Sequence, residues 1–115
     1  DGTNSNWRGW IVFVDIDADG VRDAGEPVIK SGTFDQNLAV TSSANIAAVN
    51  ERISFRADGT ARGADNVTLL TGMLAVCMAT ALPAENVRDL SLAFGSRTAV
   101  RRRNGGGACG VPNDA

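Results

Sequence analysis

The sequence contains no histidine and no tyrosine, and these absences exclude several classes of function. Without histidine there is no Ser–His–Asp or Cys–His catalysis, no histidine-ligated zinc or haem and no histidine-based pH switch. The only cysteines are Cys77 and Cys109, which are too few for a thiolate zinc site and too far apart for a redox Cys-x-x-Cys motif. The composition therefore indicates a non-enzymatic structural or binding module.

The length of the chain fits one domain. Of its 115 residues, 43% are hydrophobic and 21% are charged, which is a balance typical of globular proteins. We therefore expect a single globular domain over residues 1–115. We expect neither a transmembrane helix nor a signal peptide within it, because no hydrophobic run is long enough.

Charge is unevenly distributed along the chain, although the net charge is only −2. Residues 1–35 are rich in aspartate, whereas residues 81–115 carry a cluster of arginines. Segregation of this kind is compatible with an interaction surface at one pole of the molecule, and solvated surface charge is the commoner explanation.

Short β-branched, aromatic or alternating runs dominate the sequence, and turn residues separate them. We find no helical stripe longer than two turns, so the pattern predicts an all-β, antiparallel β-sandwich-like domain. Leu90, Leu92 and Phe94 alternate with smaller residues and predict one buried face. Trp10 is predicted to lie in the core, with Trp7 covering its edge. The expected strands cover residues 10–14, 27–30, 38–41, 53–56, 67–79 (interrupted at Gly72), 90–94 and 100–103.

Several motifs occur in one order along residues 7–109. They are Gly9–Asp15, Asp19-Gly20, Asp23–Ile29, Ile53–Thr60, the strand around Cys77, Val87–Leu92, and an arginine-rich final strand before a terminal cysteine. This order resembles the FimT/FimU minor pilins of type IV pili and the H pseudopilin of type II secretion. Two features differ from that family. Its hydrophobic N-terminal helix is absent from this chain, and its usual Gly-Arg-x-Arg motif reads Ser96–Ala99, with the arginines displaced to 101–103.

The resemblance implies a non-enzymatic minor pilin head that works through assembly with other minor and major pilins. It implies a bacterial protein whose head is periplasmic and later part of an extracellular pilus, with membrane attachment only through the absent helix. The FimT branch is implicated in binding DNA during natural transformation, and the FimU branch primes pilus assembly. Both roles remain open at this point.

The acidic loop after the first predicted strand has the spacing of a twelve-residue calcium loop. The side chains of Asp15, Asp17, Asp19, Asp23 and Glu26 occupy positions 1, 3, 5, 9 and 12, with Gly20 at position 6 and the Val21 carbonyl at position 7. The flanks are strand-like and unlike those of an EF-hand. The loop is therefore either a Ca²⁺ site or a hairpin turn whose aspartates only serve turn geometry.

The arginines of the last predicted strand also have two interpretations. In a regular strand Arg97, Arg101 and Arg103 share one face, and Arg102 lies on the other. Contacts of these arginines with successive phosphates would bind double-stranded DNA without sequence preference. Alternatively, the arginines pair with the acidic loop or a neighbouring subunit, or protect an edge strand from aggregation.

The two cysteines are expected to form a disulfide, because an exported β domain with an even cysteine count usually oxidises them. Two separate buried thiols are the alternative. A different functional class also remains open, namely a calcium-stabilised extracellular adhesion or binding module that shares only the hairpin pattern with the pilins.

Overall fold

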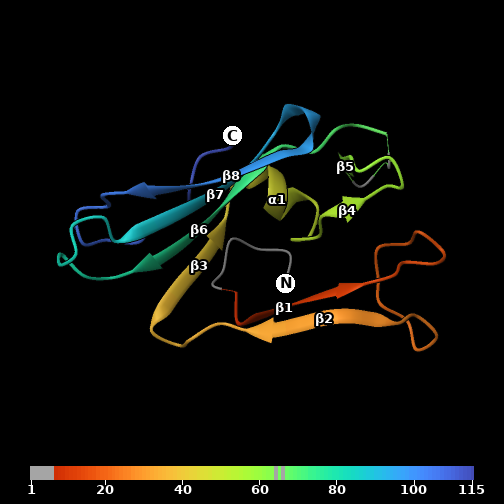
Figure 1. The fold of residues 1–115 in the computed structure, drawn as a ribbon, viewed down its shortest axis with the longest axis horizontal. Coiled ribbons are helices and arrows are strands. Elements are labelled where there is room, and N and C mark those ends of the chain that lie inside the picture. The colour runs from red at the N-terminus through yellow and green to blue at the C-terminus, as the bar shows by residue number, and fades with distance from the viewer. Residues whose placement is uncertain (1–6, 64, 66) are drawn as a thin grey trace.

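The computed structural model describes residues 7–63, 65 and 67–115, and its secondary structure is almost entirely β (Figure 1). This confirms the predicted all-β class. The elements in chain order are β1 (Gly9–Phe13), β2 (Val28–Thr33), β3 (Leu38–Ser42), α1 (Ala44–Ala48), β4 (Ser54–Phe55), β5 (Ala61–Arg62), β6 (Gly72–Met78), β7 (Val87–Ala93), the 3₁₀ turn η1 (Phe94–Ser96) and β8 (Arg97–Arg103).

The described strands form three antiparallel sheets. A four-stranded sheet has the order β3-β6-β7-β8, and two hairpins, β1-β2 and β4-β5, make the other sheets. The β1-β2 hairpin lies beneath the four-stranded sheet in Figure 1. Because β8 is the last strand of its sheet, one side of its backbone has no strand partner among the described residues.

The four-stranded sheet is covered in part on both faces. Alternate residues of β6 point to opposite faces, so Leu74 lies on one side while Ala75 and Cys77 lie on the other. One cluster consists of Ile46, Ala61, Leu70 and Leu92, with Trp7, Val49, Ile53 and Leu74 packed against it. The second cluster consists of Ala75, Cys77 and Val87, with Ala39 and Cys109 packed against it. The C-terminal tail therefore helps to bury the second face.

The short helix α1 was not predicted, because five residues are too few to show a helical stripe. Its only buried side chain is Ile46, which packs against the backbone of β6 at Gly72. A Cβ added at Gly72 would lie 2.5 Å from an Ile46 side-chain carbon, so only glycine permits this contact. Before the helix, the Ser43 hydroxyl accepts a 2.9 Å hydrogen bond from the Met73 amide. The helix is therefore attached to the start of β6.

Several strand predictions require correction. Residues 67–71 form no strand, apart from a single bridge between Leu69 and Arg62, and β6 starts at Gly72. Leu92 is buried, but Leu90 is 38% exposed and Phe94 is 74% exposed in the turn η1. The expected buried face fails because α1 and its neighbours cover only the Leu92 end of β7.

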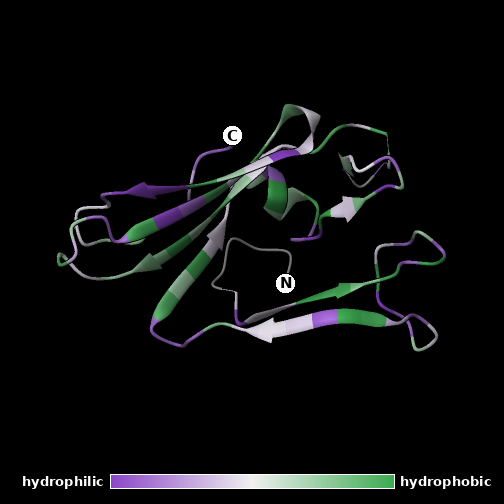
Figure 2. Ribbon diagram, viewed as in Figure 1, coloured by the Kyte–Doolittle hydropathy of each residue, from purple (hydrophilic) through white to green (hydrophobic). Residues whose placement is uncertain are grey.

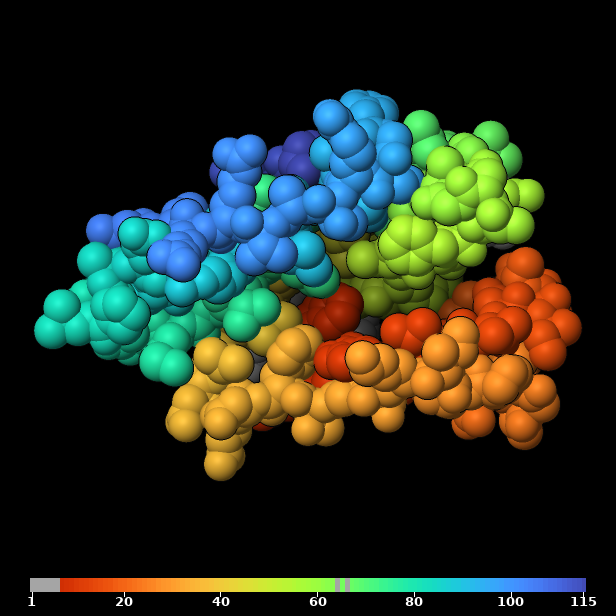
Figure 3. Space-filling view, in the orientation of Figure 1, coloured from red at the N-terminus to blue at the C-terminus, as the bar shows by residue number. Residues whose placement is uncertain are grey.

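A groove separates the β1-β2 hairpin from the segment 51–57 (Figure 3). Its volume is about 1280 Å³, and Ile11, Val12 and Phe55 are among the half-exposed side chains that line it. Trp10 also lines the groove, with its indole against Gly32, rather than lying in a core cluster as predicted. Trp7 is half-buried and packs against the cluster around Ile46, at the edge of the core. The prediction is therefore wrong for Trp10 and confirmed for Trp7.

Candidate functional site: an acidic loop and an arginine edge strand

The acidic loop closes the β1-β2 hairpin and is organised by the Glu26 carboxylate. Glu26 is only 4% exposed, and its two oxygens accept hydrogen bonds from the Ile16 amide at 2.7 Å and the Asp23 amide at 2.9 Å. The loop therefore curls around a buried carboxylate that comes from its own last position. This role for Glu26 serves loop geometry and leaves lone pairs on both oxygens.

Asp15, at the first position of the loop, has two different oxygens. Its Oδ2 accepts a 2.8 Å hydrogen bond from the Gly20 amide, whereas its Oδ1 is buried without a partner among the described residues. Gly20 has a φ of +78°, a left-handed conformation that favours glycine. The Arg52 guanidinium donates a 3.0 Å hydrogen bond to the Gly20 carbonyl and supports the loop from outside. No motif in the sequence pointed to Arg52.

The remaining aspartates bring their oxygens together. One oxygen each of Asp15, Asp17 and Asp19 lie within 4.8 Å of one another, and the same holds for Asp17, Asp23 and Glu26. Two ligands of one Ca²⁺ ion can be this far apart, since each Ca–O distance is about 2.3–2.6 Å. Carboxylate oxygens are the ligands that this ion prefers. The donor set therefore fits calcium, and the described side chains that could hold it are these five carboxylates.

The pKa of Asp17 reflects this crowding of negative charge. The hydrogen bond from the Asp19 amide lowers the pKa of Asp17. Desolvation, the charges of Asp19 and Glu26 and a hydrogen bond with Asp15 outweigh that effect, so the net result is a raised pKa. A cation within the cluster would relieve the repulsion that raises it.

The four arginines predicted to contact DNA lie on β8, and all seven residues of this strand are exposed. The register with β7 is regular from Val87–Arg103 to Ala93–Arg97, so Arg97, Arg101 and Arg103 share one face and Arg102 lies on the other. In Figure 2 the C-terminal part of β8 is a hydrophilic segment. The predicted division of the arginines between two faces therefore agrees with the register.

Arg103 differs from its neighbours because it is paired within the chain. Its Nε donates to Asp89 Oδ2 at 2.6 Å, and its Nη2 donates to Asp89 Oδ1 at 3.2 Å. The hydrogen bonds with Asp89 raise the pKa of the Arg103 guanidinium. Among the described residues, no carboxylate lies within ion-pair distance of Arg97, Arg101 or Arg102. The structure therefore separates one structural arginine from three free ones.

The alternative in which the acidic loop neutralises the arginines within one chain is wrong for the described residues. The loop and the C-terminal end of β8 lie at opposite ends of the molecule, whose longest dimension is 45 Å (Figure 1). The partner of Arg103 is Asp89 on the neighbouring strand. Each charged region thus faces solvent separately.

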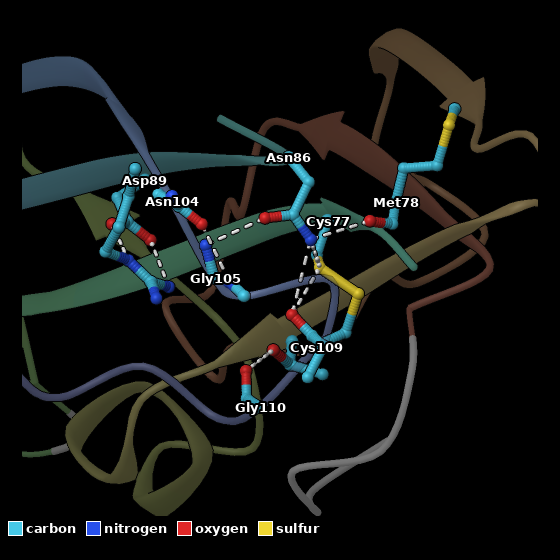
Figure 4. Close-up of a disulfide and its surroundings, with 12 residues drawn as sticks. Cys77, Met78, Asn86, Asp89, Asn104, Gly105, Cys109 and Gly110 are labelled. Atoms are coloured by element: carbon cyan, nitrogen blue, oxygen red, sulfur yellow. Dashed lines mark hydrogen bonds and ion pairs between the residues drawn. A yellow bond between two sulfur atoms is a disulfide. The ribbon is translucent and has the colours of Figure 1, made fainter. Parts of the chain in front are cut away.

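The predicted disulfide between Cys77 and Cys109 is present and joins the C-terminal tail to β6 (Figure 4). Asn86, which is 7% exposed, lies beside it. The Asn86 side chain accepts a 2.8 Å hydrogen bond from the Gly105 amide and donates a 2.8 Å hydrogen bond to the Met78 carbonyl. The glycine-rich segment 104–107 is therefore a turn held by Asn86. No sequence motif indicated this role, because the contacts join segments that are distant along the chain.

A family model places this chain among known proteins. The model of the type II transport protein GspH matches residues 1–92. The chain belongs to the GspH family. No curated protein and no solved structure matches it significantly.

Members of the GspH family are structural pseudopilins, anchored in the membrane by an N-terminal helix and exposed to the periplasm. None of the helices in the described part of this chain is long and apolar enough to cross a membrane. The family match ends at Leu92, so β8, its arginines and Cys109 lie beyond it. Membership in the family supports a role in assembly with pilin-like subunits and leaves the arginine strand unexplained.

Proposed function

We propose that this chain is the head domain of a FimT/FimU-type minor pilin, which acts in the assembly and tip complex of a type IV pilus. The family match over residues 1–92 carries this proposal, because GspH-type subunits work by associating with other pilin-like proteins. The motif order is common to both systems, so the arginine-rich last strand, which lies beyond the family match, is the feature that favours a type IV pilus over type II secretion. The proposed location is periplasmic, with an inner-membrane anchor, and then extracellular in the pilus.

A gene deletion in the native bacterium tests this proposal. We expect the deletion to reduce surface pili and natural transformation and to leave type II secretion intact, with recovery when the full-length gene is restored. Crosslinking of the full-length protein should capture minor or major pilins. Loss of secretion with normal piliation would instead assign the protein to the type II secretion system.

A second role, DNA contact, is supported by the exposure of β8. Arg97 and Arg101 lie on one face of the strand, and neither has a carboxylate partner among the described residues. We propose that this face contacts the phosphates of duplex DNA without sequence preference. Two contacts predict a slope of log affinity against log salt of about −1.8. Fluorescence anisotropy with two unrelated duplexes should give equal affinities, and absence of binding at low salt would eliminate this role.

A structural calcium ion in the acidic loop is a third proposal. The observation that favours it is the buried Asp15 Oδ1, which has no partner among the described residues and belongs to a group of converging carboxylates. When bound, the ion would offset part of the negative charge of the loop and hold the hairpin in one conformation. This role is compatible with the pilin proposal. It would also suit the alternative calcium-stabilised binding module.

A further inference from the structure

The outer edge of β8 combines backbone groups that no described strand pairs with and arginines on both faces of the sheet. Arg101 lies on one face and Arg102 on the other, and β8 has a strand partner on only one side among the described residues. Building on the assembly role proposed above, we propose that this edge binds an extended acidic segment of a partner subunit by β-strand addition. The backbone would supply hydrogen bonds, and the arginines would select the acidic side chains.

The strongest anion-binding position on this edge is a pair of arginines on neighbouring strands. Arg88 of β7 lies directly opposite Arg102 of β8, on the face away from Arg101. Side chains directly opposite each other on antiparallel strands have Cβ atoms about 4.5–5.5 Å apart, and like charges at this spacing are destabilising. Neither guanidinium has a carboxylate partner among the described residues. A carboxylate placed beside both guanidiniums would offset this repulsion.

The orientation of Arg88 is fixed by its own backbone contacts. Its Nη1 donates a 2.9 Å hydrogen bond to the Glu85 carbonyl at the end of the β6–β7 loop. The same Nη1 donates a 3.3 Å hydrogen bond to the Val87 carbonyl. Both carbonyls are neutral, so the positive charge of Arg88 remains available to an anion. The Arg88–Arg102 pair is therefore partly pre-organised, which reduces the entropy lost when an acidic side chain binds.

An added strand explains the arrangement better than the other two candidates do. A rigid duplex that lies on the Arg97 and Arg101 face cannot also contact the opposite face that carries Arg102. An added strand projects its side chains to both faces in the same alternation as β8 does. A second copy of β8 would bring arginines against arginines, which opposes self-pairing. The observations therefore favour an acidic, extended protein segment.

Binding of a model peptide to the folded domain in its disulfide-bonded form tests this inference. The probe is a fluorescein-labelled seven-residue peptide, Glu-Thr-Glu-Thr-Glu-Thr-Glu, whose glutamates all share one face when it is extended. We expect saturable binding by anisotropy at low salt, and no binding by the same peptide with lysine in place of glutamate. Hydrogen exchange should slow at alternate amides of residues 97–103, those that point away from β7.

Two variants with the same change in charge on the same strand provide matched controls. We expect Arg102→Glu to weaken peptide binding at least tenfold and Arg97→Glu, on the opposite face, to weaken it less than threefold. Both side chains are exposed and lack carboxylate partners among the described residues, so both variants should remain folded. Equal effects of the two substitutions would overturn the assignment to the Arg88–Arg102 face.

Backbone N-methylation distinguishes strand addition from simple charge attraction. In an added strand only alternate backbone amides face β8. We therefore compare two peptides, one methylated at the glutamate amides and the other at the threonine amides, and expect one of them to lose binding and the other to retain it. If both methylated peptides bind like the parent, or if duplex DNA displaces the peptide while methylation has no effect, the edge is an anion site without strand pairing and the inference is wrong. If both methylated peptides fail to bind, the inference is also wrong.

The failure of this inference can be told apart from the failure of the proposed function. Full-length Arg102→Glu protein should lose one crosslinked pilin partner while the wild type retains it. If wild-type protein crosslinks to pilins and the variant does so equally, the assembly role stands and the edge site is rejected. If neither crosslinks, whereas the peptide still binds as described, the edge site stands and the proposed assembly role is rejected.

Discussion

The ion pair between Arg103 and Asp89 leads to a prediction that distinguishes two arginines only two residues apart. Replacing Arg103 with glutamine should destabilise the fold, whereas the same change at Arg101 should not. The Asp89 side chain is 12% exposed and that of Arg103 is 46% exposed, so the pair lies between a surface and a buried ion pair. Surface pairs contribute about 0–1 kcal/mol, and breaking a buried pair costs about 3–5 kcal/mol.

We therefore expect Arg103→Gln to lower the free energy of unfolding by about 1–2 kcal/mol, between these two limits. For a domain of this size, that loss corresponds to a decrease in melting temperature of roughly 4–10 °C. Most of the effect comes from Asp89, which is buried. Its carboxylate would lose its two hydrogen bonds to Arg103.

Urea denaturation of the wild type and of each single variant would measure the loss. Arg101→Gln is the matched control, because it changes charge by the same amount on the same face, and its expected effect is below about 0.5 kcal/mol. A cycle that adds Asp89→Asn alone and with Arg103→Gln should give a coupling energy of about 0.5 kcal/mol or more. Equal stability of the Arg103 and Arg101 variants, or no coupling to Asp89, would refute the division into structural and free arginines.

Three further predictions concern the tail, the acidic loop and the β5–β6 connection. Reducing the Cys77–Cys109 disulfide, whose cysteines are 32 positions apart, should lower the free energy of unfolding by about 3–4 kcal/mol, and thiol titration of the unreduced, denatured protein should find no free thiol. Calcium at a hundredfold excess over its Kd should stabilise the wild type by about 2.7 kcal/mol in thermal melts, and Asp15→Asn should abolish this response; an unchanged wild type would reduce the loop to a turn. The pKa of Asp65 is lowered to about 2 by the hydrogen bond from the Thr68 hydroxyl and by those from the amides of Val67 and Thr68. The stabilisation from Asp65 is therefore complete above its unfolded pKa near 4 and is lost as the pH falls towards 2. The difference in melting temperature between wild type and Asp65→Asn should shrink over that range and should stay constant at higher pH.

The strands that the sequence predicted correctly are those specified by neighbouring residues. The run 10–14 is β-branched and aromatic, and β1 follows from it with a shift of one residue. The Asp58-Gly59 pair that follows the predicted strand 53–56 is typical of hairpin turns, and the structure has Gly59 at a φ of +83° between β4 and β5. In such segments the turn residues and the strand residues agree, so no distant contact is needed to identify them.

The predictions failed where a distant segment decides what is buried. Leu90 and Leu92 have the same chemistry and lie on the same face of β7, yet only Leu92 is buried, because the cluster around Ile46 covers only that end. Val87, on the other face, is buried next to Cys109 from the tail. Alternation along one strand identifies its hydrophobic face. It cannot show which part of that face another segment of the chain will bury.

The same distinction separates the two charged regions. The acidic loop is a local structure, in which Glu26 contacts residues no more than ten positions away, so its spacing alone predicted which side chains converge. The arginines of β8 are assigned by register with β7, which places Asp89 near Arg103 and Arg88 opposite Arg102. The spacing within residues 97–103 assigned each arginine to a face of the strand, but it could not identify its partner on β7. The two faces of β8 carry different arginines, so a substitution at Arg97 should affect contacts with DNA and one at Arg102 should affect strand addition. Measuring the binding of DNA and of the acidic peptide to both variants would establish whether this edge has one function or two.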